Sequence, residues 1–259
     1  MILSRRVKLN GQHLDELHDA IVIRRVDPGT TKENITAVDL MGGFGQRITG
    51  SHFQTLEAKI SYAIDLPKDK IAARRNVFDL VNAWAVGGGW LQLNEIPGRR
   101  AYIDKVVLPS ARDLRDWTEE FEITFRAYAV PFWQDDTPTQ ATKNGVSDGS
   151  VQLQVNGNTE TVFNIKWKNI SGASINNLRI WESGGSTMNL TNFPPVGGSA
   201  TIDFTHTNQG ILTVKSGDTD LYSYLVGDDD TFIKPGLHTI RFTCARAGNI
   251  TLSAYGRYL

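Results

Sequence analysis

The chain has 259 residues, of which 40% are hydrophobic and 21% are charged, so it can bury a core and is not expected to be disordered. The formal net charge is −1, with 18 Lys and Arg against 19 Asp and Glu up to residue 136, and 9 against 9 after it. This balance in both halves argues against broad electrostatic binding to nucleic acid, which needs clustered cations.

The cysteine count and the apolar runs exclude several further classes. A single cysteine, Cys244, rules out an intrachain disulfide and a zinc site built on cysteines, and its alternating surroundings predict a small core residue. No apolar run approaches the roughly 20 residues that span a bilayer, and the N-terminus lacks the apolar stretch of a signal peptide. We expect a protein made in the cytoplasm, without membrane insertion.

The first part of the chain alternates between apolar and polar residues, which predicts strands. Such strands are expected around residues 3–9 and 21–23, and over 35–40 and 56–64. Between the last two lies a glycine-rich stretch, 41–50, which predicts a flexible hairpin or a projecting loop. It contains Met41, Phe44 and Ile48. These apolar side chains indicate either a partner surface or a hairpin folded onto its own core, and the two alternatives stay open here.

The next element is predicted to be an amphipathic helix. Asp65 can cap it, Pro67 suits its first turn, and Gly87-Gly88-Gly89 should end it. Arg74 is expected to lie away from the apolar stripe. The stripe has the spacing i, i+3, i+4, i+7 and consists of Val77, Leu80, Val81 and Trp84.

A predicted hairpin follows the helix. A short strand at 91–93, a turn at 97–99 and a returning strand at 101–107 make it up, and Trp90 and Tyr102 are its aromatic residues. After a charged segment, a cleanly alternating strand runs over 121–129, with glutamates on its outward face.

The second part of the chain has a different pattern. A polar, turn-rich stretch at 134–149 is interpreted as a linker between residues 1–133 and 150–259. Beyond it come about eight short alternating segments separated by turns, including one at 247–249, a spacing typical of an antiparallel β-sandwich. Trp167 shares a face with Phe163 and Ile165, which places it in the expected core.

We find no sequence pattern for catalysis, a cofactor or a metal. His13 and His18 are five residues apart, where a helical metal pair needs three or four, and Asp228–Asp230 lacks the order of a calcium loop. Glu119, Glu120 and Glu122 are candidates for a glycosidase by residue type alone. The chain is therefore expected not to be an enzyme.

Sugar binding is the main alternative that the residues themselves suggest. Trp181 is expected to be exposed, because Leu178 and Ile180 take the opposite face of its strand. Its indole could stack on a sugar ring, with Asn177 and Arg179 as polar partners.

The order of the parts resembles the distal tail proteins, often abbreviated Dit, of phages with long non-contractile tails. The features that carry this resemblance are the helix followed by Leu91-Gln92-Leu93, the turn Pro97-Gly98-Arg99 with Tyr102 on the returning strand, the alternating strand that runs into Pro131-Phe132-Trp133, and the stretch from Phe232 through Pro235-Gly236 to Ile240. The resemblance covers essentially the whole chain, although each motif by itself is degenerate.

This resemblance implies a mainly β fold, with an N-terminal α+β domain and a C-terminal domain. The N-terminal domain would be β-barrel-like with one helix, and the C-terminal one a galectin-like antiparallel β-sandwich. It also implies a homo-hexameric ring at the tail tip of the virion, assembled in the host cytoplasm. The ring would join the tail tube to a tail-lysin or fibre trimer and let DNA pass through its channel.

Two surfaces are the expected contacts in such a ring, the 41–50 loop with Met41, Phe44 and Ile48, and the hairpin with Trp90 and Tyr102. The rival hypothesis is a monomeric carbohydrate-binding protein that assists adhesion to a host cell-surface glycan through Asn177, Arg179 and Trp181. No cofactor, no metal and no sequence-specific nucleic acid enters either hypothesis.

Overall fold

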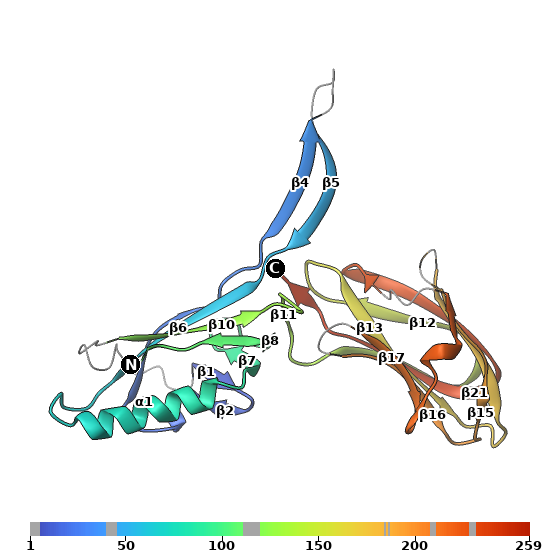
Figure 1. Ribbon diagram of the computed structural model, residues 1–259. Coiled ribbons are helices and arrows are strands. Elements are labelled where there is room, and N and C mark those ends of the chain that lie inside the picture. Colours follow the sequence, from blue (N-terminus) through green and yellow to red (C-terminus); the bar gives the residue numbers. More distant parts are fainter. Residues whose placement is uncertain are drawn as a thin grey trace. The chain divides into compact units, whose positions relative to one another are not determined.

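The computed structural model describes residues 6–39, 46–110, 120–183, 185, 187–207, 211–227 and 232–259. The chain divides into two compact units, an N-terminal one that ends at Trp133 and also takes Leu259, and a C-terminal one over Gln134–Tyr258. Figure 1 shows them in blue to green and in green to red along the sequence. Each unit is described by itself.

Two larger antiparallel sheets, a two-stranded hairpin and one helix form the N-terminal unit. The first sheet includes, in adjacent order β2-β1-β7-β8, the strands β1 (Val7–Leu9), β2 (Gln12–His13), β7 (Gly89–Leu93) and β8 (Arg99–Ile103). The other has the order β3-β6-β10-β9, and its strands are β3 (Ile21–Asp27), β6 (Leu56–Ile64), β9 (Lys105–Val107) and β10 (Phe121–Ala127). A short 3-10 turn, η1 (Leu14–Glu16), precedes β3.

The alternation of the strands decides which face is buried. In β10, Phe121, Ile123 and Phe125 are almost fully buried, while Glu122 between them is exposed. Phe121 lies opposite Tyr62 of β6, and its ring centroid is 5.4 Å from that of Phe78 on the helix. The inner face of this sheet therefore packs on the helix, and the outer face keeps the charges.

The helix, α1 (Ile71–Ala85), begins six residues later than Asp65, the predicted cap. The main-chain N–H of Asp65 donates to Ala20 O at 2.8 Å, which ties this residue to the start of β3. Pro67 instead opens a turn that the N–H of Lys70 closes on Pro67 O at 3.0 Å. Lys70 is the N-cap and makes no side-chain capping bond, so the predicted cap is wrong.

The buried face of α1 also differs from the predicted stripe. Leu80 is 39% exposed, and the buried face instead consists of Arg74, Val77, Phe78, Val81 and Ala85. Arg74 was expected to point away, yet only 6% of it is exposed, because its Nη1 donates to the carbonyl oxygens of Ile64 and Leu66 at 3.0 and 2.9 Å. The turn before the helix supplies these acceptors, and a sequence pattern does not show them.

The predicted glycine stop of the helix is confirmed. Gly88 has φ +60°, and a Cβ at this position would lie 2.5 Å from Ile103 O. The N–H of Gly88 donates to Ala85 O at 3.1 Å, which closes the last turn. A residue without a side chain is needed here for both the backbone angle and the close approach to β8.

The strands β4 (Glu33–Asp39) and β5 (Gln46–Phe53) form a separate two-stranded sheet. Figure 1 shows this hairpin extending away from the other strands of its unit. Its base is held by the N–H of Gln54, which donates to Lys32 O at 2.7 Å, and by edge-to-face packing of Phe53 on Phe132 at 4.9 Å. The second half of the predicted 41–50 loop therefore belongs to strand β5.

The C-terminal unit is β-structured, and its main sheet is antiparallel. Its described strands are β12 (Thr139–Val155), β13 (Thr161–Asn169), β14 (Ile175–Glu182), β15 (Thr187–Val196), β16 (Thr201–His206), β17 (Leu212–Ser216), β18 (Thr219–Asp220), β19 (Leu225–Gly227), β20 (Phe232–Ile233), β21 (Gly236–Ala254) and β22 (Arg257–Tyr258), with a 3-10 turn η2 (Tyr222–Tyr224). A short strand, β11 (Trp133–Asp135), spans the boundary between the units. The main sheet order is β18-β17-β16-β13-β21-β14-β15-β19, with β12 paired to β21.

Two long strands fold this sheet into layers. The first part of β21, 236–244, pairs with the last part of β12 and with β14, whereas residues 248–254 pair with the first part of β12 and with β13. The register of β12 slips between Lys143 and Val146 and again before Asp148. Bulges of this kind bend a strand, so β12 and β21 each pass from one layer to the other.

The core of this unit lies between the two layers. Trp167 is fully buried, as predicted, and its ring centroid is 5.6 Å from that of Phe242. The stretch predicted to be a turn at 247–249 lies within the continuous strand β21, so that prediction is wrong. A Cβ at Gly248 would collide with the Trp167 indole, so glycine is needed for this close approach. Cys244 is 9% exposed, which confirms a core position.

The predicted linker at 134–149 is corrected by the structure. Residues 139–149 form the first part of β12, and they pair with β21 along their length. Their side chains alternate between half-buried and exposed, and most are polar. The sequence therefore resembled a polar linker, although the main chain belongs to the sheet. The mainly β fold with one α-helix in the described N-terminal residues is confirmed.

Candidate functional site

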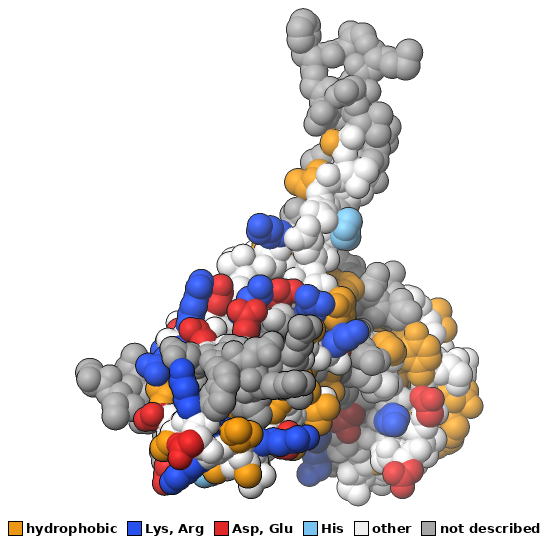
Figure 2. Space-filling model, turned by 60° about the vertical axis from the view of Figure 1, so that its left-hand side comes forward, with side chains coloured by type: hydrophobic (Ala, Val, Ile, Leu, Met, Phe, Trp, Pro, Cys, Tyr) orange, Lys and Arg blue, Asp and Glu red, His pale blue; other side chains and the backbone are white. Residues whose placement is uncertain are grey.

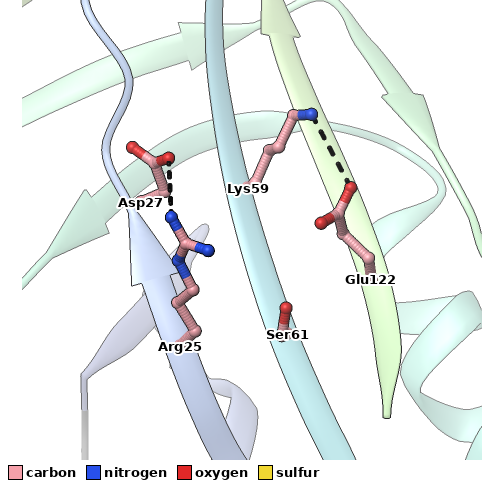
Figure 3. Close-up of a pocket in the computed structure, with 5 residues that line it drawn as sticks. All are labelled: Arg25, Asp27, Lys59, Ser61 and Glu122. Atoms are coloured by element: carbon pink, nitrogen blue, oxygen red, sulfur yellow. Dashed lines mark ion pairs between the residues drawn. The ribbon is translucent and has the colours of Figure 1, made fainter.

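A shallow depression of about 190 Å³ lies on the charged outer face of the sheet β3-β6-β10-β9. It is lined by Arg25, Asp27, Lys59, Ser61 and Glu122. The sheet register brings them together, because Asp27 lies opposite Lys59 while Arg25 and Glu122 both lie opposite Ser61. Figure 3 shows Lys59 reaching toward Glu122 and Arg25 toward Asp27.

The charges in this depression are paired with one another. Lys59 Nζ lies 3.8 Å from Glu122 Oε1 and 3.5 Å from Glu57 Oε1, and Arg25 Nη2 lies 3.7 Å from Asp27 Oδ2. Asp27 and Glu122 flank the depression, but Lys59 lies between them and both carboxylates are engaged. Solvent-exposed pairs of this length contribute little stability, and they present no field of a single sign.

The same mixture of charges extends over neighbouring surface. Arg126 Nε donates to Glu57 Oε2 at 2.9 Å on the same outer face. In Figure 2, Lys and Arg side chains lie among Asp and Glu side chains near the base of the projecting hairpin. Such a surface has no stripe of cations that could hold a polyanion. Sequence reasoning found Glu122 by type but not this depression, because the depression depends on the register of three strands.

The hairpin of β7 and β8 carries a half-exposed aromatic cluster. Trp90 and Tyr102 are directly opposite partners in the register, and their ring centroids are 5.2 Å apart at an interplanar angle of 71°. The guanidinium of Arg100 lies over the indole of Trp90, 4.1 Å from its centroid. The structure thus brings together the two predicted residues, Trp90 and Tyr102, and adds Arg100. This arginine could have been predicted, because residues two apart on a strand, such as Arg100 and Tyr102, share a face.

This aromatic cluster is firmly positioned. Its strands bury the opposite face, on which Leu91 and Ala101 are fully buried. Asn10 fixes the start of β7, since its Oδ1 accepts from the N–H of Trp90 and its own N–H donates to Trp90 O, both at 2.9 Å. The half-exposed rings of Trp90 and Tyr102 are therefore held rigidly at a surface, as aromatic anchors of interfaces are.

The predicted sugar-contact residues share the exposed face of β14. Asn177 and Arg179 are exposed and Trp181 is half-buried, whereas Leu178 and Ile180 between them are buried, as the sequence predicted. The guanidinium of Arg179 lies 4.9 Å from the ring centroid of Trp181. A depression of about 230 Å³ opens beside them between β14, β15 and β21.

Several other predicted residues have a different outcome. Met41 and Phe44 lie outside the described residues, and Ile48 belongs to β5, where its register partner is Ala37. Asp228–Asp230 also lie outside them. Within the described ranges, no group of three or more His, Cys, Asp or Glu residues is arranged to hold a metal. No helix in the described part is long and apolar enough to cross a membrane.

Two basic side chains of the C-terminal unit, the half-buried His206 and the buried Arg257, have lowered pKa values. The pKa of His206 is lowered to about 4, mainly by burial and secondarily by the nearby charge of Arg257. Burial also lowers the pKa of Arg257 to about 10. The ring Nδ1 of His206 lies 3.1 Å from Asn164 Oδ1, which also accepts from the His206 main-chain N–H at 2.9 Å.

Solved structures with a similar fold are known. A crystal structure of the SPP1 Dit protein, described as a paradigm of the hub adsorption apparatus in phages that infect Gram-positive hosts, matches 98% of this chain and 99% of its own, with a TM-score of 0.68 and 12% identity. The chain has a Dit-like fold. The similarity covers both units, and the two units follow one another along the chain in the same order in the two proteins.

Other comparisons are weaker. Chains of the phage p2 baseplate in its activated conformation match with TM-scores of 0.48 in the form with Sr and 0.46 in the form with Ca, at 9% and 8% identity. They cover 91% and 92% of this chain and 90% of their own. No protein-family model matches the Dit-like chain, and no curated protein sequence matches it.

Proposed function

We propose that this chain is a structural protein of a phage tail tip. In this proposal it forms a homo-hexameric distal tail ring that joins the tail tube to the tail-tip or receptor-binding apparatus, including a tail-lysin or fibre trimer. The observation that carries the proposal is the Dit-like fold over nearly the whole length of both chains. The protein would act through its interfaces and not as an enzyme.

The open sheet of the N-terminal unit supports ring assembly. Its order β3-β6-β10-β9 leaves β3 and β9 as edges within the described residues, on opposite sides of one sheet. Unpaired edges are templates for pairing with another chain, and two different edges give a head-to-tail contact. Repeated head-to-tail contacts close into a ring when the rotation between copies allows it.

The β4–β5 hairpin gives a second reason to expect assembly. It forms a sheet of two strands, and Ile35 on it is 57% exposed. An isolated two-stranded hairpin is at best marginally stable in water, so a partner surface is expected to cover it. We propose that the 41–50 segment at its end, with Met41, Phe44 and Ile48, contacts a neighbouring subunit or the next ring.

The aromatic cluster is the other proposed contact. Trp90 and Tyr102 are held on a rigid hairpin and half-exposed, and burial of two such rings would contribute strongly to a subunit interface. DNA passage through the ring fits a chain whose outer sheet face pairs its charges, because such a face would not retain a polyanion. The proposed location is the virion tail tip, after assembly in the host cytoplasm.

Mass measurement tests the proposal directly. The full chain is separated by gel filtration, its mass is measured by light scattering, and the peak is imaged in negative stain. A ring with six times the 28.7 kDa mass of the chain, or two stacked rings, is the expected result. Ile48→Asp should lower the ring fraction while far-UV circular dichroism stays unchanged. A monomer at all concentrations, both alone and with the tail tube protein, would contradict the proposal.

Carbohydrate binding is kept as a second candidate function. The face of β14 that presents Asn177, Arg179 and Trp181 beside a depression supports it. In this alternative the C-terminal unit contacts a host cell-surface glycan and assists adhesion.

A further inference from the structure

On one face of the second layer of the C-terminal unit, polar side chains of β21, β14 and β15 lie side by side. One row of directly opposite residues runs across β21, β14, β15 and β19, namely Thr243, Arg179, Asn189 and Val226. The next row holds Arg241, Trp181 and Thr187. Arg179 stands in the middle of the first row. Residues far apart in the sequence therefore meet around one guanidinium.

Arg179 has an unusual setting for a surface arginine. Its guanidinium lies against the indole of Trp181, with 4.9 Å between Cζ and the ring centroid. Within the described residues it forms no hydrogen bond and no ion pair. Stacking uses the flat face of a guanidinium and leaves the N–H groups at its edge free to donate. The indole thus limits where the cation can lie and leaves its donors available.

The depression beside Arg179 holds further groups that can bind a ligand. It has a volume of about 230 Å³, and most of its exposed lining is apolar, with Leu178, Leu190, Cys244 and Ala245 among the lining residues. The polar residues of the lining are Asn177, Arg179, Asn189, Thr191 and Thr243. Asn177 is held in place, because its Oδ1 accepts from the N–H of Asn192 at 3.3 Å. Within the described part of the chain, the side chains of Asn189, Thr191 and Thr243 form no hydrogen bond.

The charges around the depression select the kind of ligand. Its lining contains one cation, Arg179, and no carboxylate. Arg241 adds a second exposed cation in the next row of the same face. Amides and hydroxyls provide both donors and acceptors, which suits the hydroxyl groups of a sugar, whereas a guanidinium suits a carboxylate.

The geometry points to a binding site for an acidic saccharide on this face. Arg179 takes the carboxylate of a uronate ring, and Asn189, Thr191 and Thr243 take its hydroxyl groups. Trp181 acts as a positioning residue that holds the guanidinium. This site lies outside the surfaces that the ring proposal uses and does not depend on that proposal.

The test titrates the full-length chain with three probes and follows binding by calorimetry. Trigalacturonate is the acidic probe, a neutral galactose trisaccharide is its matched control, and inorganic phosphate reports binding of a simple anion. Trigalacturonate should bind with a dissociation constant on the order of 1 mM or below, at least about tenfold tighter than the other two. No saturable binding of trigalacturonate, or equal binding of the neutral sugar or of phosphate, would overturn the assignment.

Variants separate this site from general electrostatics. Arg179→Gln should weaken trigalacturonate binding about tenfold or more, because it removes charge-assisted hydrogen bonds. Lys168→Gln removes the same charge from an exposed position on β13, in the other layer, and should change binding less than about twofold. Equal effects of the two variants would show non-specific attraction and overturn the proposal.

The role of Trp181 has its own readout. Trp181→Ala should weaken binding, and Trp181→Phe should restore most of it, because phenylalanine keeps a ring on which Arg179 can stack. A failure of both variants to alter binding would remove Trp181 from the site. The ring mass of Arg179→Gln should equal that of the unchanged protein. The saccharide site and the hub role can therefore fail independently.

Discussion

Arg74 donates from its buried guanidinium to the main-chain carbonyl oxygen of Ile64 at 3.0 Å, and so joins helix α1 to the end of strand β6. The same Nη1 reaches the carbonyl oxygen of Leu66 in the following turn. A charged side chain in the first turn of the helix therefore anchors the helix to the segment before it, although it does not cap the helix N–H groups.

Arg74→Met should destabilise the N-terminal unit by about 2–3 kcal/mol, because it leaves two carbonyl oxygens without their charged donor. Thermal unfolding of the full chain, with hydrogen exchange of α1 and β6 peptides, measures the effect. Arg75→Met is the matched control, since the Arg75 side chain is 71% exposed and lies 3.8 Å from Asp79. It should cost about 0.5 kcal/mol or less, and an equal loss in the two variants would refute this role of Arg74.

Gly88→Ala should destabilise the same unit by about 2–4 kcal/mol, from left-handed backbone strain together with a clash against Ile103 O. Gly87→Ala is its neighbouring control. A Cβ at Gly87 meets no atom within 4 Å, so this change should be neutral or slightly stabilising. The urea unfolding midpoints of the two variants measure the difference in stability between them. Equal midpoints would contradict the prediction and would show that the helix end can shift by one residue.

Trp90→Ala and Tyr102→Ala should each weaken ring formation by about 2 kcal/mol, or roughly 30-fold in the dissociation constant, if the aromatic cluster is a subunit contact. Mass photometry over a dilution series measures the ring fraction. Tyr222→Ala serves as the control, because it removes an aromatic ring that is 40% exposed in the C-terminal unit. Rings that survive all three changes equally would exclude the cluster from the interface.

His206 should make the C-terminal unit less stable in mild acid. Its folded pKa of about 4 lies below the ordinary histidine value of 6.5, so between these values the unfolded chain binds the extra proton. Stability from this group is complete above about pH 6.5 and is lost progressively as the pH falls toward 4.

The expected loss between pH 7 and pH 5 is on the order of 1 kcal/mol after allowance for partial solvent screening. Hydrogen exchange of β13 and β16 peptides at the two pH values measures it. The variant His206→Gln should lose less stability over this interval, because it retains only the contributions of other groups. An identical pH dependence in both proteins would contradict the assignment to His206.

Local patterns predicted much of this fold. Period-two alternation located β6, β10 and β14, and three consecutive glycines located the end of α1. Trp167 and Cys244 were placed in the core because their neighbours two residues away are apolar. In each case the structure is determined by residues close together in the sequence, so the spacing of apolar residues and glycines is enough to predict it.

Other features depend on contacts between distant segments. The first part of β12 is mostly polar, with Ala141 and Val146 packed partly against the core. Its main chain is ordered by pairing with β21, which lies about one hundred residues away. Arg74 was misplaced for the same reason, since its acceptors are main-chain oxygens of another element. Both depressions combine side chains from three strands, so their composition depends on register, which spacing within one strand does not report.

The passage of β12 and β21 through both layers has a mechanical consequence for the C-terminal unit. In a sandwich whose layers meet through side chains alone, a pulling force can separate the layers by opening the core. Here the layers share two strands, so parting them would also require main-chain hydrogen bonds to break along both strands. A unit with this connectivity should therefore resist tension as one body.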